Sequence, residues 1–352
     1  MKKAGRAVFW ILFLALYAAG SAFILYPFIG NALQSASYTE AIEEFQNLAL
    51  SGDEEETEVS ETSEAEDSGG SSGSAESEED ASPDYTELLE LMQAYNEQIW
   101  EEGQSGLVDA WSYEQAAVDL SGYGIEDGVI GYITIPAMDS EMPIYLGATE
   151  ENMSKGVVNL GETSLPIGGE NTNCVLAAHR GYSGIAFWRE IEKIELGDYV
   201  YITNLWETLT YQVCGIEIID PDEMDKVLIQ EGRDMVTLVT CHPYRGHGAY
   251  RYVVYCERVY GEVSDPDLEE EESGIPLLSD ISGLVRGEDS GADISVSDGS
   301  AFESSEQAIL LEQVLQTAGL ILDAAVLAAL LVMLFRHLRK RRKRKKQNDG
   351  SG

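Results

Sequence analysis

The stretch Met235-Val-Thr-Leu-Val-Thr-Cys241 has the pattern of a β-strand that ends in a thiol. Its β-branched and apolar residues favour extended structure, and the following His-Pro-Tyr-Arg-Gly at 242–246 is typical of a loop. Thr240 and Cys241 therefore lie where a strand opens into a loop. Cys241 is a candidate nucleophile, although a cysteine in a strand is more often a small buried hydrophobic residue.

Short runs of the same character lie on both sides of this stretch, and turn signals separate them. They cover residues 129–135, 175–178, 199–203, 209–219 and 250–260. Many short strands at this spacing, with one helix expected around 187–194, predict a closed or nearly closed β-barrel of about 130 residues over 128–261. This segment has enough patterned apolar content for a sizeable core.

Two of these runs carry a polar side chain that suits amide chemistry. The run at 175–178 leads into His179, and Arg251 opens the strand after the cysteine loop. Cleaving and remaking an amide needs a thiolate nucleophile, a group that protonates the departing amine, and positive charge for the developing oxyanion. The sequence supplies all three types of side chain. The 62 residues between His179 and Cys241 say nothing about their distance before the fold is known.

Two further histidines lie near Cys241. His242 adjoins it, but successive residues of an extended segment point to opposite faces, which counts against His242 as the base. His247 lies in the loop before Arg251 and is a candidate for tuning the site or contacting substrate, as is Thr240. The alternative for His247 is an ordinary surface loop residue.

The four cysteines, at 174, 214, 241 and 256, lack the spacing of metal ligands. We therefore expect no metal and no other cofactor. If Cys241 is a free thiol, at most one disulfide forms. Cys214 and Cys256 both fall in strand-like runs, which makes them the candidate pair.

Two long apolar stretches lie just inside the basic ends of the chain. Residues 7–28 and 309–335 are each long enough to cross the roughly 30 Å of a bilayer core. Because Lys and Arg are retained on the cytoplasmic side, both termini are expected inside and the segment between the spans outside. The alternative for the first stretch is a cleaved signal peptide, which would export the same segment. Asp323 is expected near the outer interface, solvated or protonated.

The formal net charge is −41, and the basic residues concentrate in the tips at 1–6 and 336–352. The middle of the chain therefore offers no basic patch for nucleic acid. Acidic, Ser-rich and Gly-rich residues fill 51–84 and 262–308, which predicts two disordered tethers. Helical periodicity is expected at 29–50 and again at the start of 85–127.

The run Thr237-Leu-Val-Thr-Cys241, Arg251 ten residues on, and Ala178-His-Arg-Gly181 together resemble the catalytic motifs of Gram-positive sortases. The resemblance covers about 131–258. It implies a mostly β fold, an eight-stranded sortase-type barrel with N-terminal helices and a lid, flanked by two transmembrane helices. It also implies that Cys241 is the nucleophile, His179 the general acid/base and Arg251 the oxyanion-stabilising cation. The implied substrate is a Leu-Pro-x-Thr-Gly-like sorting signal of a surface protein, cut between Thr and Gly.

Two features resemble the class C, pilin-polymerising branch of that family: the C-terminal span, and the Thr-Ser-Leu-Pro-Ile-Gly-Gly segment at 163–169. In that branch a lid places an Asp and an aromatic residue over the nucleophile. Asp109-Ala-Trp111 resembles this lid, without its proline. The alternative is a linker tryptophan that packs on the barrel rim. His242 and the 245–250 loop depart from the pattern and leave the fine substrate specificity open.

The resemblance leaves the accepting amine open. In a pilin polymerase it is a pilin lysine, and in a housekeeping or accessory sortase it is the amine of a peptidoglycan precursor. A reading from another class is a catalytically silent barrel that scaffolds a surface complex.

Overall fold

The structure is a computed structural model that falls into two compact units. It describes residues 2–58, 85–113, 118–123, 125, 128–182, 184–246, 248–261, 294–297, 299, 302 and 304–349. One unit comprises 1–33, 183–185 and 305–352, and the other comprises 34–182 and 186–304. The first contains the apolar helices and the second contains the β-structure.

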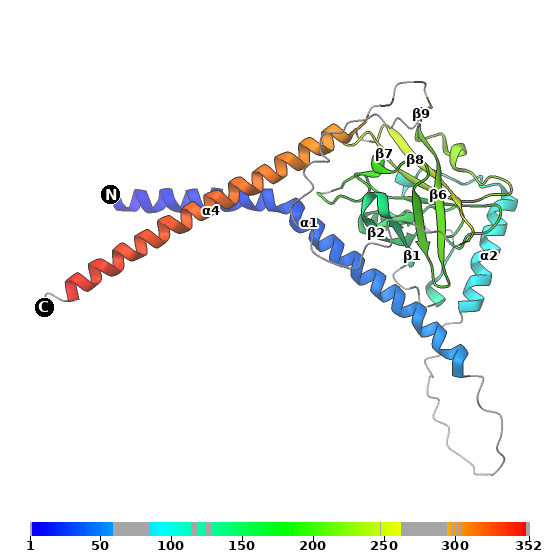
Figure 1. Ribbon diagram of the computed structural model, residues 1–352, viewed down its shortest axis with the longest axis horizontal. Helices are drawn as coiled ribbons and strands as arrows, with labels where there is room; N and C mark the ends of the chain where they lie inside the picture. The colour runs from blue at the N-terminus through cyan, green and yellow to red at the C-terminus, as the bar shows by residue number, and fades with distance from the viewer. Residues whose placement is uncertain are drawn as a thin grey trace, which may run out of the picture. The chain divides into compact units, whose positions relative to one another are not determined.

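The second unit is built around a closed barrel (Figure 1). Its strands are β1 (Val129–Ile135), β2 (Ser140–Leu146), β3 (Val157–Asn159), β4 (Thr172–Ala177), β5 (Tyr199–Thr203), β6 (Thr208–Ile219), β7 (Asp234–His242) and β8 (Tyr250–Arg258). They pair in the order β5-β1-β2-β3-β4-β7-β8-β6, and an antiparallel β5–β6 pairing closes the ring. A two-residue strand, β9 (Ser295–Val296), runs parallel to β6. The eight-stranded barrel expected from the resemblance is confirmed.

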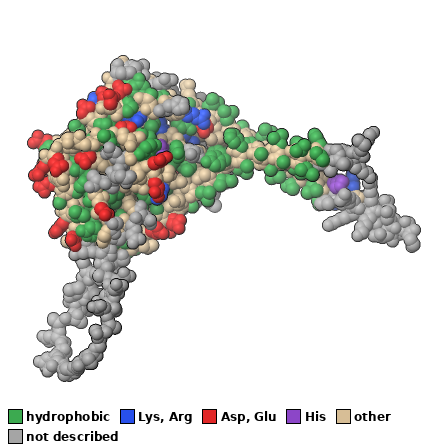
Figure 2. All heavy atoms as spheres, turned by 180° about the vertical axis from the view of Figure 1, so that it is seen from behind, with side chains coloured by type: hydrophobic (Ala, Val, Ile, Leu, Met, Phe, Trp, Pro, Cys, Tyr) green, Lys and Arg blue, Asp and Glu red, His purple; other side chains and the backbone are tan. Residues whose placement is uncertain are grey.

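Alternation of apolar side chains fills the barrel, because neighbouring residues of a strand face opposite sides. The largest fully buried side chains include Trp188, Tyr211 and Tyr252. Acidic side chains are prominent on the face of this unit that Figure 2 shows. The close-packed apolar interior fixes the positions of the strands and so of the residues at their ends.

The pairing of β4 with β7 sets the geometry of the site. These two strands are parallel, and every paired residue in β4 is matched by the residue 62 positions later in β7, from Thr172 with Asp234 to Ala177 with Val239. Antiparallel β8 follows β7 and places Arg251 directly opposite Cys241. Strand ends from three separate parts of the sequence are thereby brought to one rim.

Helix α2 (Tyr85–Glu102) packs on the barrel unit through Leu88, Met92 and Ile99, which are buried at the spacing of one helix face. Asn96, on the same helix, accepts a hydrogen bond from the Leu165 amide (2.7 Å) and donates to the Leu165 carbonyl (3.3 Å). A short helix, α3 (Glu150–Lys155), is capped by Thr149, whose hydroxyl accepts from the Asn152 amide at 3.1 Å. The expected helix at the start of 85–127 is thus present.

Several local expectations need correction. The helix expected around 187–194 is only a 3₁₀ turn, η4 (Ile191–Lys193). Strands β2 and β3 and helix α3 were not anticipated from the sequence. Cys214 and Cys256 form no disulfide, because Cys214 lies in a β-bulge and is exposed, whereas Cys256 pairs with Val213 and is buried.

The expected tethers also differ from the structure in part. Helix α1 (Lys2–Glu58) continues through 51–58, the start of the predicted acidic tether. Strand β9 and the first turn of α4 (Glu306–Asp349) fall inside the predicted 262–308 tether. Residues 59–84 and 262–293 lie outside the described residues.

The first unit contains two candidate membrane helices, Val8–Leu50 in α1 and Glu306–His337 in α4, of which the former extends into the second unit. Apolar side chains are visible along the extended part of this unit in Figure 2. The Ser21 hydroxyl donates to the Asp323 carboxylate (2.5 Å), and the Tyr17 hydroxyl donates to the Asp323 carbonyl (3.1 Å). Asp323 therefore has hydrogen-bond partners in α1.

Candidate active site

Cys241 and Arg251 face each other across β7 and β8. The Arg251 guanidinium Nη1 lies 3.9 Å from the Cys241 sulfur and also donates to the carbonyls of Gly248 (2.8 Å) and Tyr250 (3.1 Å). Gly248 has a φ of +70°, and a Cβ there would lie 3.1 Å from the Cys241 sulfur and 3.2 Å from Nη1. A glycine at 248 therefore leaves room for the thiol and the guanidinium to approach.

His179 lies two residues beyond the end of β4, and Cys241 is the second-last residue of β7. The Ala178 amide donates to the Val239 carbonyl (3.3 Å), and the Thr240 hydroxyl donates to the Ala178 carbonyl (2.7 Å). The 62-residue offset of these two strands, extended past their last pair, brings His179 level with Cys241. Thr240, singled out from the sequence as a substrate candidate, is instead fully buried and ties the two strand ends together.

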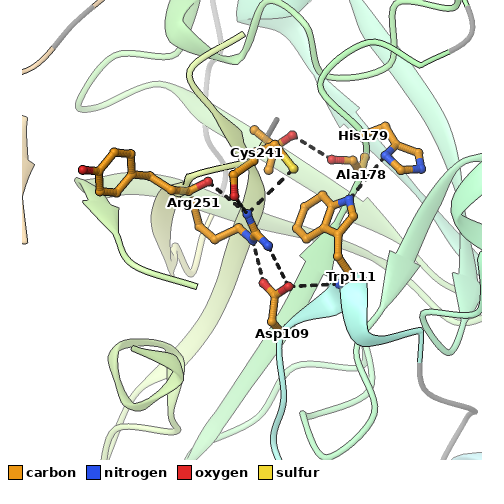
Figure 3. A network of polar contacts seen from close by, with 9 residues as sticks. Asp109, Trp111, Ala178, His179, Cys241 and Arg251 are labelled. Carbon is orange, nitrogen blue, oxygen red and sulfur yellow. Dashed lines mark hydrogen bonds and ion pairs between the residues drawn. The ribbon is translucent and has the colours of Figure 1, made fainter. Parts of the chain in front are cut away.

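The segment at 109–112 lies beside Arg251 and His179 (Figure 3). Asp109 caps the 3₁₀ turn η1 (Ala110–Ser112) and accepts two hydrogen bonds from Arg251, from Nε at 2.6 Å and from Nη2 at 2.7 Å. The Trp111 indole N–H points at His179 Nδ1 (3.4 Å), and its ring lies 4.4 Å from the Arg251 guanidinium carbon. One short turn thus contacts both the cation and the imidazole.

Burial dominates the electrostatics of the thiol and the imidazole. Burial raises the pKa of Cys241 to about 11; the charge of Arg251 works in the opposite direction, and Asp109 adds to the rise. Burial also lowers the pKa of His179 to about 4. Tyr182 stacks on the His179 ring at 4.5 Å, and Phe187 meets it edge-on at 5.8 Å. With η1 in place, the thiol and the neutral imidazole are the favoured forms.

A cavity of about 300 Å³ opens beside His179. It is lined by Tyr113, Glu150, Glu151, Ser154, His179 and Tyr182. Among the residues that the structure describes, no group of three His, Cys, Asp or Glu side chains gathers in a geometry that could hold a metal ion. The chemistry available at this rim is that of a thiol, an imidazole and a guanidinium.

The remaining sequence candidates are His242 and His247. His242 is buried and bonds to Arg180 on the side away from the thiol, as the alternation of a strand predicts. His247 lies outside the described residues. Gly248 was missed, although a glycine two residues from the start of a strand is a recognisable signal for close backbone approach. Arg180 had no predicted role beyond its place in the Ala178–Gly181 motif.

The site and barrel together define a class of protein, a β-barrel with a cysteine, a histidine and an arginine at one rim. The Sortase domain family model matches residues 133–259. Sortase D of Bacillus subtilis is 29% identical over 131 residues, which are 37% of this chain and 63% of that protein. The chain thus spans less than two thirds of that relative.

Two solved structures extend the comparison. The Streptococcus agalactiae sortase C1, in complex with MTSET, is 36% identical over 51% of this chain and 92% of that one, with a TM-score of 0.46. The Streptococcus pneumoniae sortase C is 30% identical over 63% of this chain and 97% of that one, with a TM-score of 0.49. The match of the Sortase domain model to 133–259 shows that the barrel segment is a sortase domain, and sortases are a family of cysteine transpeptidases.

Proposed function

We propose that this chain cleaves a Leu-Pro-x-Thr-Gly-like sorting signal between Thr and Gly and transfers it to an amine. The observation that carries the proposal is the meeting of Cys241, His179 and Arg251 at one rim, through the β4–β7 register and the β7–β8 pair. Each side chain has a distinct part in amide transfer, and no two of them are neighbours in sequence.

In the first half-reaction, the Cys241 thiol gives its proton to His179, and the resulting thiolate attacks the threonine carbonyl carbon and forms a tetrahedral oxyanion. Arg251 offsets the negative charge on that oxygen. The C–N bond to glycine then breaks, His179 gives a proton to the leaving amine, and a thioester remains on Cys241. In the second, the incoming amine attacks the thioester, His179 takes its proton, and the C–S bond breaks to release the new amide.

The closed arrangement of η1 supports a lid over this machinery. Asp109 occupies two N–H groups of Arg251 that would otherwise be free for the oxyanion, and Trp111 occupies Nδ1 of His179. Because burial raises the pKa of Cys241 in this state, the nucleophilic thiolate is also scarce. Opening of η1 would free the guanidinium and imidazole and expose the thiol to water. We assign Asp109 and Trp111 to this lid.

Adduct formation tests the proposal directly. The full chain in detergent is incubated with a sorting-signal peptide, and Cys241 is examined by mass spectrometry. We expect a thioacyl adduct whose mass equals the peptide without its glycine end, and none with Cys241→Ala. Absence of any adduct on the wild-type chain would instead support a silent scaffold.

We further propose that the accepting amine is a pilin lysine, as in the class C branch. The C-terminal membrane helix and the segment at 163–169 support this assignment, and the Streptococcus pneumoniae relative is described in terms of pilin substrate specificity. Incubation with purified pilin should give a ladder of covalent multimers. Single attachment to a peptidoglycan-precursor amine, with no ladder, would favour a wall-anchoring sortase.

The two candidate membrane helices support anchoring at the cell membrane, and we propose that both termini are cytoplasmic with the barrel outside. Exposed Cys214 offers a natural probe of this topology. A membrane-impermeant maleimide should label Cys214 on intact cells, whereas a cysteine added after residue 352 should react only after permeabilisation. Labelling of the added cysteine on intact cells would reverse the assignment.

A further inference from the structure

A buried group of charged and polar side chains lies on the other side of the strand ends from the thiol. It consists of Arg180, Glu192 and His242, whose side chains are 2%, 10% and 4% exposed. The Arg180 Nη1 group lies 2.8 Å from His242 Nδ1, and its Nη2 group forms an ion pair with Glu192. Glu192 is also 3.6 Å from His242 Nδ1. The three side chains thus satisfy one another away from water.

This network is attached to both strand ends that carry the proposed catalytic residues. Arg180 follows His179 directly in the chain, and its Nη1 group also donates to the Cys241 carbonyl at 3.4 Å. His242 follows Cys241 directly. The Arg180 side chain therefore bridges the backbone after β4 to the last residues of β7.

The His242 ring is held in its neutral form. Burial, and next the charge of Arg180, lower the pKa of His242 to about 4, whereas Glu192 opposes that fall. Because Arg180 has only donors, His242 Nδ1 must accept, which places the ring proton on Nε2. Buried ion pairs add little net stability but leave a costly unpaired charge when one partner is removed. Such a cluster is suited to holding the neighbouring backbone in one arrangement.

Residues just ahead of the second membrane helix cover the network. Phe302 stacks on the His242 ring, with centroids 5.8 Å apart, and the Ser304 hydroxyl donates to the second carboxylate oxygen of Glu192 at 2.9 Å. Helix α4 begins at Glu306, two residues later. The segment that leads into α4 thus contacts the network of Arg180, Glu192 and His242.

We propose that Arg180, Glu192 and His242 are positioning residues that hold the strand ends of His179 and Cys241 in register, and that Phe302 and Ser304 couple the C-terminal anchor to them. The proposal rests on the proposed function for its kinetic readout. Its physical basis is that a displacement of about 1 Å at a reacting group can lower the rate by about 100-fold.

The first test compares Arg180→Gln with Arg233→Gln in the full chain. Arg233 also pairs with a carboxylate, Glu257, but at the opposite end of β7. We expect Arg180→Gln to lower kcat for thioacylation by about 10- to 100-fold with KM within about threefold, because the peptide contacts are kept while alignment is lost. Arg233→Gln should leave both constants near wild type. An Arg180→Gln protein that is folded, with normal kcat, would overturn the positioning role.

The second test uses Phe302→Ala and Ser304→Ala, which lie at the edge of the network and so spare the barrel core. We expect kcat to fall by about 3- to 10-fold with little change in melting temperature, in the same direction as Arg180→Gln. If both variants are as fast as wild type, the coupling to the anchor is refuted. These variants also decide the matter if Arg180→Gln does not fold.

Failure of the proposed function is recognised separately. A wild-type chain that forms no thioacyl adduct would refute the proposed function. The structural role of the network would then be tested by amide hydrogen exchange. Exchange at residues 239–242 should then be faster in Phe302→Ala than in wild type. Unchanged exchange would refute the structural role of the network in holding the strand ends, whatever reaction the chain catalyses.

Discussion

Arg251 divides its guanidinium between a carboxylate and a thiol. Its Nε and Nη2 groups bind Asp109, while Nη1 faces the Cys241 sulfur. The same side chain is 5% exposed, so its charge acts through little water. Opening of the lid would release the Nε and Nη2 groups of this cation beside the thiol, where they could stabilise a developing oxyanion.

Replacement of Arg251 by alanine should cripple turnover without unfolding the barrel. We expect kcat to fall by about 10²- to 10³-fold, the usual loss when one oxyanion donor is removed. Thioacylation rates of purified protein, with circular dichroism as the folding check, would measure it. Near-normal turnover in Arg251→Ala would remove Arg251 from the mechanism.

Replacement of Asp109 by asparagine should lower the pKa of Cys241. Asp109 raises that pKa and Arg251 lowers it, so loss of the carboxylate leaves the cation unopposed. We expect the pKa of Cys241 in Asp109→Asn to lie below that of the wild-type chain. The pH dependence of Cys241 alkylation, followed by mass spectrometry, measures the pKa.

A suitable control is Asp139→Asn, which changes an exposed aspartate in the turn after η3 (Pro136–Met138). That variant should alkylate like wild type. A Cys241 pKa that is the same or higher in Asp109→Asn would mean that the carboxylate does not restrain the thiol.

At the level of elements, η1 is a single 3₁₀ turn that contacts the site through the side chains of Asp109 and Trp111. The contacts of Trp111 with Arg251 and His179 should stabilise the closed position of η1 by about 1 to 2 kcal/mol, a range typical of buried cation–π pairs. A loss of that size changes an open-to-closed ratio by about 5- to 30-fold.

Trp111→Ala should therefore speed peptide processing by about 5- to 30-fold, since a larger fraction of the protein would have an open site. Initial rates at subsaturating peptide measure this. Trp100→Ala, at a half-exposed tryptophan on α2, is the matched control and should not change the rate. No acceleration in Trp111→Ala would argue that this tryptophan merely packs on the barrel rim.

The elements also differ in how well the sequence predicted them. The runs at 129–135 and 199–203 match β1 and β5, because alternating apolar and β-branched residues bounded by turns are a local signal. Strand β2 was missed because Pro143 lies inside it, and proline argues against a strand. Strand β3 has only three residues and pairs in parallel with β2, which no local pattern encodes.

For the whole molecule, two histidines couple stability to pH. His179 and His242 both have a pKa lowered to about 4 by burial, whereas in the unfolded chain a histidine titrates near about 6.5. The folded state keeps both rings neutral, so the unfolded state binds more protons below that pH. Their contribution is fully present above about pH 6.5 and is lost as the pH falls toward 4.

The free energy of unfolding should therefore decrease between pH 6.5 and pH 5, by at most about 1.4 kcal/mol per pH unit for each proton taken up. Denaturant unfolding of the full chain at both pH values would measure this slope. His242→Asn removes one of the two rings and should make the slope shallower. An identical slope in His242→Asn would show that His242 does not carry the effect.

The sequence alone indicated the side-chain types that could carry amide transfer in this protein. It identified a barrel segment, placed a thiol, an imidazole and a guanidinium at strand ends, and marked apolar stretches at both ends of the chain. These are local properties, because side-chain periodicity and strand boundaries depend on neighbours along the chain.

Only the tertiary structure decided which strand ends meet. The separation of 62 residues between His179 and Cys241 does not fix their distance in space. The parallel pairing of β4 with β7, which has the same offset of 62, brings the two residues to one rim. The contacts of Arg180 with Glu192 and His242, and of Asp109 with Arg251, likewise depend on segments far apart in the chain. The physical reason is that pairing across a barrel is fixed by packing of the whole core, which no short stretch of sequence contains.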